Sequence, residues 1–326
     1  MTRFAFSRRT ALFAALAVAF PLLAGCPPAA DPNPGESTAS TTTTGGTTGS
    51  AMSSPGAESP TPGSEPVSGS LTISGSSTLQ PLSEQWAQEF NKQNPKLEIS
   101  VKGGGSGQGI SALINKSTDI ANSSRKMKDE EFAQAKAKGI EVKEIPVAMD
   151  GITMIVNPKN PVKSLTVQQL ADIYTGKVKD WKEVGGTPGK IVAYGRDEAS
   201  GTHEFFKEDV LKKAEYRADM VKSKANPAIG TGVGQNAGAI GYIGVAFAEE
   251  YVKAGKVKEV PVAFKTGEEP VLPTVENVHS GKYPISRALY NYVSGEPTGA
   301  MKAYMDYVVS DAGQKIVSDQ GYITLK

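Results

Sequence analysis

The sequence predicts an α/β fold of two lobes, each a mostly parallel sheet flanked by helices. Short apolar segments alternate with helical ones from residue 71 onward, in the βαβαβαβ order that is typical of such sheets. Several expected strands end in loops rich in glycine, serine and threonine, and open α/β sheets bind ligands at the carboxyl ends of their strands. The long apolar segment 151–158 suits a crossover between lobes, so we expect the ligand in the cleft between them.

The spacing of apolar residues defines the elements of the first lobe. Leu82, Trp86 and Phe90 recur at helical spacing and are expected in the core, and Pro95 ends that helix. In chain order we expect a strand at 71–74, a helix around 82–90, a strand at 97–101, a helix around 110–114, a strand at 119–121, a helix at 129–138 and an extended segment at 141–147.

The second lobe is expected to repeat this alternation. Its elements are the crossover strand 151–158, a helix at 166–174, a turn around 181, a strand at 190–194, a helix through 203–206, a strand at 238–243, a return crossover at 283–293 and closing helices at 301–309 and 313–317. The stretch 230–238 is richer in glycine than a helix favours. Lobe I should comprise 71–156 and 289–326, and lobe II 157–288, with hinges near Asn157 and Leu289.

Residues 1–25 predict a lipoprotein signal peptide. A basic start with Arg3, Arg8 and Arg9 precedes the apolar segment 10–23. Leu23-Ala24-Gly25-Cys26 then resembles a bacterial lipobox, in which the cysteine is acylated and becomes the mature N-terminus. The alternative is an ordinary secretory signal with an incidental cysteine. The segment 7–10 resembles a twin-arginine signal, so both Sec and Tat export stay open.

The segment 26–70 is expected to be a lipidated cysteine followed by a disordered tether. Beyond Cys26 it is dominated by proline, glycine, serine, threonine and alanine, with no lysine, arginine or aromatic residue. Such a composition buries too little apolar surface to offset the entropy of ordering. As a flexible coil it spans roughly 35–40 Å, which is enough to hold a domain clear of a membrane.

The composition excludes several classes of function. The chain has one cysteine and two histidines, so we expect no disulfide, no zinc or iron–sulfur site, and no cofactor. Basic and acidic residues are nearly balanced, 35 against 34, which gives no reason to expect nucleic acid as a partner. If the ligand is an anion, local groups must therefore capture it.

Three loops have the composition of anion-binding sites. They are 75–78, 103–109 and 196–202, and each lies where an extended segment gives way to a helix. A helix N-terminus carries unpaired N–H groups and a partial positive charge, and glycine lets a ligand approach the backbone. The third loop adds Arg196, whose planar guanidinium suits a tetrahedral oxyanion. Together the loops predict a pocket for a small oxyanion.

The motifs of common enzymes are absent from the sequence. Around Ser106 a serine-hydrolase elbow fails, because Gln108 stands at its final glycine position. His203 and His279 have no recognisable acidic partner nearby in sequence, the dinucleotide fingerprint is misplaced, and the Gly-Lys-Ser/Thr of a P-loop is missing. We therefore expect a binding protein and not an enzyme. For His203, a partly buried structural role is favoured over a contact with ligand.

The ordered set of motifs resembles the substrate-binding lipoprotein of the bacterial phosphate ABC importer, which has the type II periplasmic binding protein fold. The residues that carry the resemblance are 75–78, 103–110, 119–125, 150–152, 157–162, 165–166, 172–176, Trp181, 196–202, 238–242 and 284–287. The resemblance implies a monomer outside the cytoplasm that captures inorganic phosphate between closing lobes and delivers it to permease and ATPase subunits. It also implies that the protein belongs to the cell envelope and is anchored to a membrane by lipid. The protein would then lie in the periplasm or on the outer face of the cytoplasmic membrane. The alternatives are a protein for sulfate or molybdate, and a sensor or adhesion protein that delivers nothing.

Carried over residue by residue, the resemblance implies a phosphate site with contacts from both lobes. The implied contacts are Thr78, the backbone amide of Leu79, Ser106, Ser124, Arg196, Ser200, Gly201 and Thr202. Ser124 departs from the family, because some members have an aspartate there that accepts the proton of phosphate. We assign the role of proton acceptor to Asp150. Alternatively, Asp150 is an acid at a strand end that faces water or caps a turn and has no role in binding. Glu198 is expected to orient Arg196.

Overall fold

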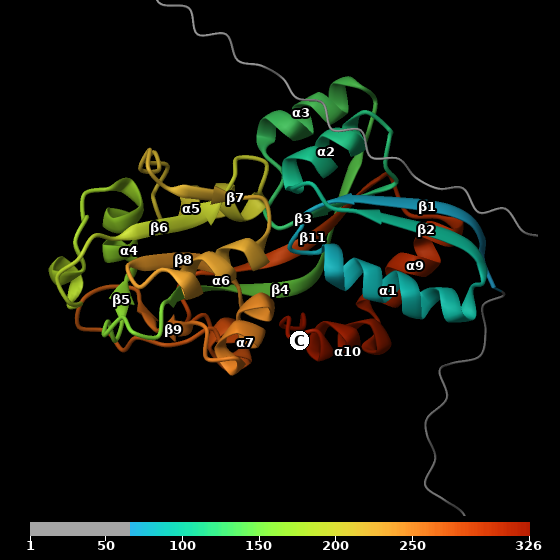
Figure 1. Cartoon of the computed structure of the whole chain (residues 1–326). Coiled ribbons are helices and arrows are strands. Elements are labelled where there is room, and N and C mark those ends of the chain that lie inside the picture. The colour runs from blue at the N-terminus through green and yellow to red at the C-terminus, as the bar shows by residue number, and fades with distance from the viewer. Residues whose placement is uncertain (1–65) are drawn as a thin grey trace, which may run out of the picture. The chain divides into compact units, whose positions relative to one another are not determined.

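A computed structural model describes residues 66–326, which are arranged around one long sheet (Figure 1). The predicted signal peptide 1–25, Cys26 and the tether as far as residue 65 lie outside the described residues. The strands follow the order β2-β1-β3-β11-β4-β8-β6-β7, with β9 beside β4. Within residues 66–326, no helix combines the length and apolar character that a membrane crossing requires.

The first half of the sheet is parallel, as predicted. Its elements are β1 (Ser68–Gly75), α1 (Gln80–Gln93), β2 (Lys96–Lys102), α2 (Ser106–Ile114), β3 (Ile120–Ser123) and α3 (Asp129–Ala137). Strand β1 pairs in parallel with β2 on one side and β3 on the other. It begins at Ser68 and not at residue 71, because 68–70 pair with 96–98. The tether prediction is therefore three residues too long at this end.

The centre of the sheet is antiparallel, which the strand-by-strand prediction did not foresee. The two extended segments expected at 141–147 and 151–158 form one strand of 15 residues, β4 (Val142–Val156). Its first part pairs antiparallel with β11 (Ser286–Ser294), and from Ile152 onward it pairs antiparallel with β8 (Ala239–Gly244). The register places Arg287 directly opposite Asp150. The middle of the sheet thus brings two charged residues side by side.

The second half again carries parallel strands at its outer edge. Its elements are β5 (Leu165–Thr166), α4 (Val167–Thr175), the short 3-10 helix η1 (Trp181–Val184), β6 (Val192–Arg196), α5 (Gly201–Asp209), β7 (Val221–Ser223), α6 (Asn226–Gln235), β8, α7 (Val245–Lys253), β9 (Lys258–Val260), β10 (Val262–Ala263) and α8 (Val275–His279). Strand β6 pairs in parallel with β7 and β8. The chain returns along β11 to α9 (Gly299–Val309) and α10 (Asp311–Asp319), near α1 (Figure 1).

The two ends of the sheet have separate hydrophobic cores. At one end Trp86 and Phe90 are buried with residues of α9 and α10, and the indole of Trp86 donates a 2.9 Å hydrogen bond to the carbonyl of Gly313. At the other end Tyr174, Phe206 and Tyr242 pack together. The residues of β4 from 152 to 156 pack with this second end. The division into lobes at 156/157 and 288/289 stays a prediction.

The glycines of the 230–238 stretch allow close packing in place of breaking the helix. A Cβ at Gly230 would lie 2.8 Å from the ring of Tyr251, and a Cβ at Gly232 would lie 2.4 Å from the ring of Tyr194. Glycine has a low helix propensity, but at these positions it lets the two tyrosine rings pack directly against the backbone of α6. This packing explains why the helix contains glycine there.

Candidate functional site

The start of α1 contributes Thr78 and Leu79 to a buried polar site. The hydroxyl of Ser76 accepts hydrogen bonds from the N–H groups of Thr78 and Leu79, at 3.2 and 3.4 Å. The Thr78 Oγ1 atom lies 3.3 Å from Thr202 Oγ1, at the start of α5. Two of the predicted contact residues, 124 positions apart in the chain, thus meet through their hydroxyls.

The start of α2 brings Ser106 and Ser124 to the same place. Ser106 Oγ accepts a 3.0 Å hydrogen bond from the Ser124 N–H and lies 3.3 Å from Ser124 Oγ. Gly201 faces them from α5, because a Cβ at this position would lie 2.3 Å from Ser106 Oγ and 2.8 Å from Ser124 Oγ. The position therefore requires glycine for steric reasons.

The start of α5 is held by Ser200, which caps the helix. Its hydroxyl accepts hydrogen bonds from the N–H groups of Thr202 and His203, at 3.1 and 3.4 Å. The His203 Nδ1 atom lies 2.9 Å from the carbonyl oxygen of Arg196, and burial lowers the pKa of His203. A neutral imidazole that donates to this carbonyl agrees with the structural role expected for His203. The N-terminus of α5 thus adds its partial positive charge to the site.

Arg196 ends β6 and carries a buried guanidinium that has no carboxylate partner among residues 66–326. It is 1% exposed, and its Nη2 atom donates to Ser77 Oγ and to the Lys224 carbonyl, both at 2.6 Å. Nε donates to the carbonyl of Ser223 at 3.2 Å, and Nη1 donates to Asn226 Oδ1 at 3.4 Å. Burial lowers the pKa of Arg196 to about 10, so the group remains cationic at neutral pH. A buried cation with neutral partners favours an anion beside it.

The prediction that Glu198 orients Arg196 is wrong. Glu198 is an exposed residue that forms an ion pair with Lys222. The backbone carbonyls of Ser223, at the end of β7, and of Lys224, together with the side chain of Asn226, hold the guanidinium instead. Glu198 follows the end of β6 by two residues, where the chain turns outward, so closeness in sequence did not produce contact.

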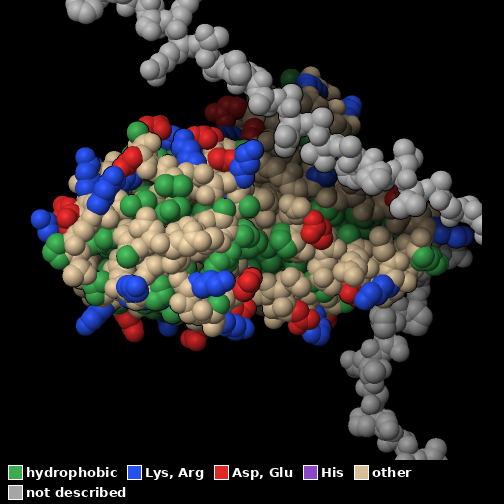
Figure 2. All heavy atoms as spheres, in the orientation of Figure 1, with side chains coloured by type: hydrophobic (Ala, Val, Ile, Leu, Met, Phe, Trp, Pro, Cys, Tyr) green, Lys and Arg blue, Asp and Glu red, His purple; other side chains and the backbone are tan. Residues whose placement is uncertain are grey.

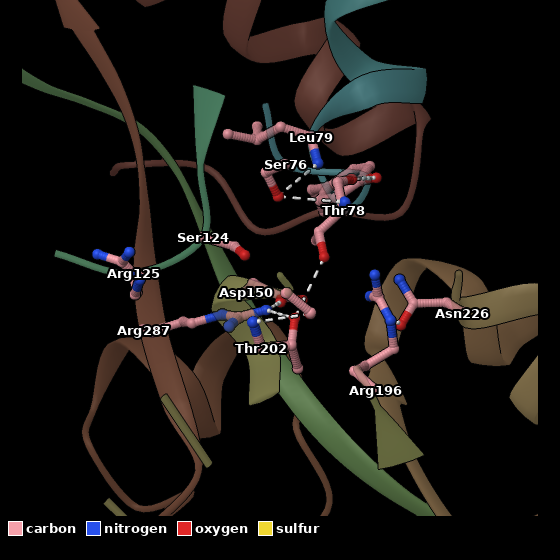
Figure 3. Close-up of polar contacts among 12 residues, drawn as sticks. Ser76, Thr78, Leu79, Ser124, Arg125, Asp150, Arg196, Thr202, Asn226 and Arg287 are labelled. Carbon is pink, nitrogen blue, oxygen red and sulfur yellow. Dashed lines mark hydrogen bonds and ion pairs between the residues drawn. The ribbon is translucent and has the colours of Figure 1, made fainter. Parts of the chain in front are cut away.

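Asp150 and Arg287 form a buried ion pair at the centre of the sheet (Figure 3). Asp150 is 0% exposed, and its Oδ2 atom accepts a 2.9 Å hydrogen bond from Arg287 Nη2. The same Nη2 atom donates a 2.7 Å hydrogen bond to Thr202 Oγ1. Burial raises the pKa of Asp150, and the Arg287 charge opposes that rise. The sequence prediction omitted Arg287 from the contacts, although the 284–287 segment matched the family and lies on the return crossover.

Several contacts join the two halves around the site. Besides Thr78–Thr202 and Ser77–Arg196, the Gly107 N–H donates to the Ala199 carbonyl at 3.5 Å. Lys128, before α3, forms a 2.5 Å ion pair with Glu204 of α5. A cavity of about 800 Å³ opens beside these contacts; Arg287 is part of its lining, but none of the predicted contact residues is. The cavity therefore borders the polar site at Arg287.

The arrangement suits a small oxyanion. Hydroxyl groups, helix starts and two arginines converge on one buried region, and Figure 3 shows Thr78, Ser124, Thr202 and Arg196 around it. Among residues 66–326, no group of His, Cys, Asp and Glu side chains is placed to hold a metal ion. On the face that Figure 2 shows, basic and acidic side chains are interspersed.

Comparison with known proteins shows which family the chain resembles. A family model described as a PBP superfamily domain matches residues 60–312. The phosphate-binding protein PstS of Staphylococcus saprophyticus is 37% identical over 251 residues, covering 75% of this chain and 77% of that protein. Protein SphX of Synechococcus elongatus is 35% identical over 256 residues, covering 75% and 74% of the two chains.

Solved structures share the fold. A candidate phosphate ABC transporter substrate-binding protein from Clostridium perfringens, with bound phosphate, is 34% identical with a TM-score of 0.70, covering 79% of this chain and 100% of that one. An ABC-type phosphate transport receptor from Vibrio cholerae is 27% identical with a TM-score of 0.64, covering 78% and 99%. Fold and site thus define a periplasmic-binding-protein-like domain of the PBP superfamily, as predicted.

Within that superfamily, the chain belongs to the family of the phosphate-binding proteins PstS. This is a family of substrate-binding proteins and not of enzymes, in agreement with the sequence prediction.

Proposed function

We propose that this protein captures inorganic phosphate outside the cytoplasm and delivers it to an ABC importer. The observation that carries the proposal is the buried Arg196 guanidinium, which has neutral oxygen partners and lies beside the starts of helices α1 and α5. Phosphate would supply the missing negative charge and accept hydrogen bonds from the surrounding hydroxyls. Membership of the PstS family and the phosphate in the C. perfringens relative support the choice of this anion.

The proposed contacts come from both halves of the molecule. They are Thr78, the amide of Leu79, Ser106, Ser124, Arg196, Ser200, Gly201 and Thr202. Because the Thr78 and Thr202 hydroxyls lie 3.3 Å apart, an anion between them requires the halves to separate slightly and then to close around it. Hinges near Asn157 and Leu289 would allow this movement. Asp150 is proposed to supply the selectivity for phosphate over sulfate.

Titration calorimetry with the purified full chain tests the choice of anion. Phosphate, sulfate and molybdate are titrated separately at pH 7 and at equal ionic strength. The proposal expects saturable heat with phosphate and affinity at least about a hundredfold weaker for sulfate. Sulfate has no proton at pH 7 to offer a buried acceptor, and an unpaired acceptor in a desolvated site costs about 1–3 kcal/mol or more. Clear binding of sulfate or molybdate without binding of phosphate would assign the protein to another oxyanion.

Delivery to a transporter and the lipid anchor are separate parts of the proposal. The importer role predicts that cells lacking this protein lose high-affinity phosphate uptake, whereas a sensor or adhesion protein would leave uptake unchanged. The anchor rests on the lipobox ending at Cys26. A diacylglycerol and an amide-linked chain would hold the protein firmly, since each buried methylene contributes about 0.8 kcal/mol.

A further inference from the structure

Arg287 has the surroundings of a ligand contact and not only those of a structural ion pair. Its Nε and Nη1 atoms are buried, and neither has a hydrogen-bond partner among residues 66–326. Only Nη2 is used, by Asp150 Oδ2 and Thr202 Oγ1. Buried donors on a charged group are costly when they are left unpaired. An anion beside Thr202 would give these donors an acceptor.

The guanidinium of Arg287 is also held firmly in place. Its Cζ atom lies 5.3 Å from the centre of the Phe205 ring, and Asp150 fixes one end through the 2.9 Å contact. Figure 3 shows the side chain reaching from β11 toward Thr202, on the side of the site away from Arg196. The anion space is thus flanked by an arginine on each side.

We propose that Arg287 binds the phosphate directly, and that Asp150 is its positioning partner. This inference rests on the proposed function and deepens it. By donating to Thr202 Oγ1, Arg287 also leaves the Thr202 hydroxyl proton free to point at the anion. Asp150 offsets the Arg287 charge, so the two arginines and one carboxylate together present one net positive charge.

This charge balance explains how Asp150 selects phosphate without touching it. At pH 7 sulfate is always doubly charged, whereas phosphate is a mixture of singly and doubly charged forms. Removing the Asp150 charge leaves two uncompensated cations, which strengthens binding of the fully ionised anion more. When Arg287 is neutral, its charge no longer opposes the rise in the pKa of Asp150 that burial causes, so the buried carboxyl should take up a proton. The effect of Asp150 on selectivity should then disappear.

A double-mutant cycle on the full chain tests this inference. Phosphate and sulfate affinities are measured at pH 7 for wild type, Arg287→Gln, Asp150→Asn and the double variant. Arg287→Gln should weaken phosphate binding about tenfold or more, as the loss of a charged hydrogen bond does. Asp150→Asn should lower the phosphate-to-sulfate ratio in the wild-type background and leave it unchanged in the Arg287→Gln background.

The design separates this inference from the proposed function and from folding effects. If wild type fails to bind phosphate, the proposed function falls. If wild type binds but the double variant keeps wild-type phosphate affinity, Arg287 is purely structural and the inference alone is overturned. An Asp150→Asn effect that persists with Arg287→Gln would show that Asp150 acts on the anion independently of Arg287, and the positioning role would be overturned. If Arg287→Gln alone does not fold, the phosphate affinity of the double variant tests whether Arg287 binds the anion. The double variant removes both charges and so leaves no unpaired buried carboxylate. Arg217→Gln, at a buried arginine paired with Asp219, is the matched control and should leave phosphate affinity unchanged.

Discussion

Replacing Arg196 by alanine should weaken phosphate binding far more than replacing Ser124. Arg196 is a desolvated cation whose partners, at 2.6 to 3.4 Å, are all neutral oxygens, so its charge is available to the anion. Losing such a charged contact costs about 2–5 kcal/mol, which is roughly a thirtyfold to several-thousandfold loss of affinity. Ser124→Ala removes one neutral hydroxyl and keeps the N–H that donates to Ser106, so about 0.5–1.5 kcal/mol is expected.

Titration calorimetry with phosphate measures this difference, and thermal unfolding without ligand checks that each variant folds. Arg196→Lys serves as an intermediate, because it keeps the charge and loses the planar fork. It should bind more tightly than Arg196→Ala and more weakly than wild type. Equal losses for Arg196→Ala and Ser124→Ala would refute the reasoning, because the site would then not be organised around a buried cation.

Three further predictions concern the glycine at the site, the buried histidine and the anchor. Gly201→Ala should weaken phosphate binding about tenfold, because its Cβ would displace the Ser106 and Ser124 hydroxyls at a cost of about 1–3 kcal/mol. Gly189→Ala is the control and should bind normally in the same titration, because the nearest atom to its Cβ would be the Thr187 carbonyl oxygen, at an unstrained 4.0 Å. Burial lowers the pKa of His203, so as pH falls the unfolded chain takes up the proton first, and stability is lost below about pH 6.5. Between pH 7.5 and 5.5 the denaturant midpoint should therefore fall more for wild type than for His203→Gln. Equal falls would show that His203 does not contribute to the pH dependence of stability. Cys26→Ser should abolish incorporation of a labelled fatty acid while phosphate affinity stays unchanged, and unlabelled wild-type protein in the medium would count against a lipid anchor.

The sequence was most informative where the signal is local. A strand that ends in a Gly/Ser/Thr loop before a helix predicts a helix N-terminus, and the starts of α1, α2 and α5 do meet in the structure. The packing of Trp86 and Phe90 in the core followed from helical spacing in the same way. That the residues at the starts of α1, α2 and α5 contact phosphate stays a prediction.

The sequence could not predict contacts that depend on the register of paired strands or on the direction in which a side chain points. Arg287 meets Asp150 across 137 positions only because β11 pairs with β4 in one register, and a shift of one residue would turn its side chain to the other face. The union of 141–147 and 151–158 into one strand likewise depends on pairing with both β11 and β8. The prediction for Glu198 failed because it relied on closeness in sequence to Arg196. Two residues beyond β6 the side chain already faces solvent and pairs with Lys222.

A crystal structure of the full chain with phosphate tests the central claim most directly. The anion should lie between the starts of α1, α2 and α5, within hydrogen-bond distance of Arg196 and Thr202 on one side and of Thr78 and Ser106 on the other. Phosphate bound to one half alone, or in the open cavity beside α3 and α5, would contradict the account of capture between two closing lobes.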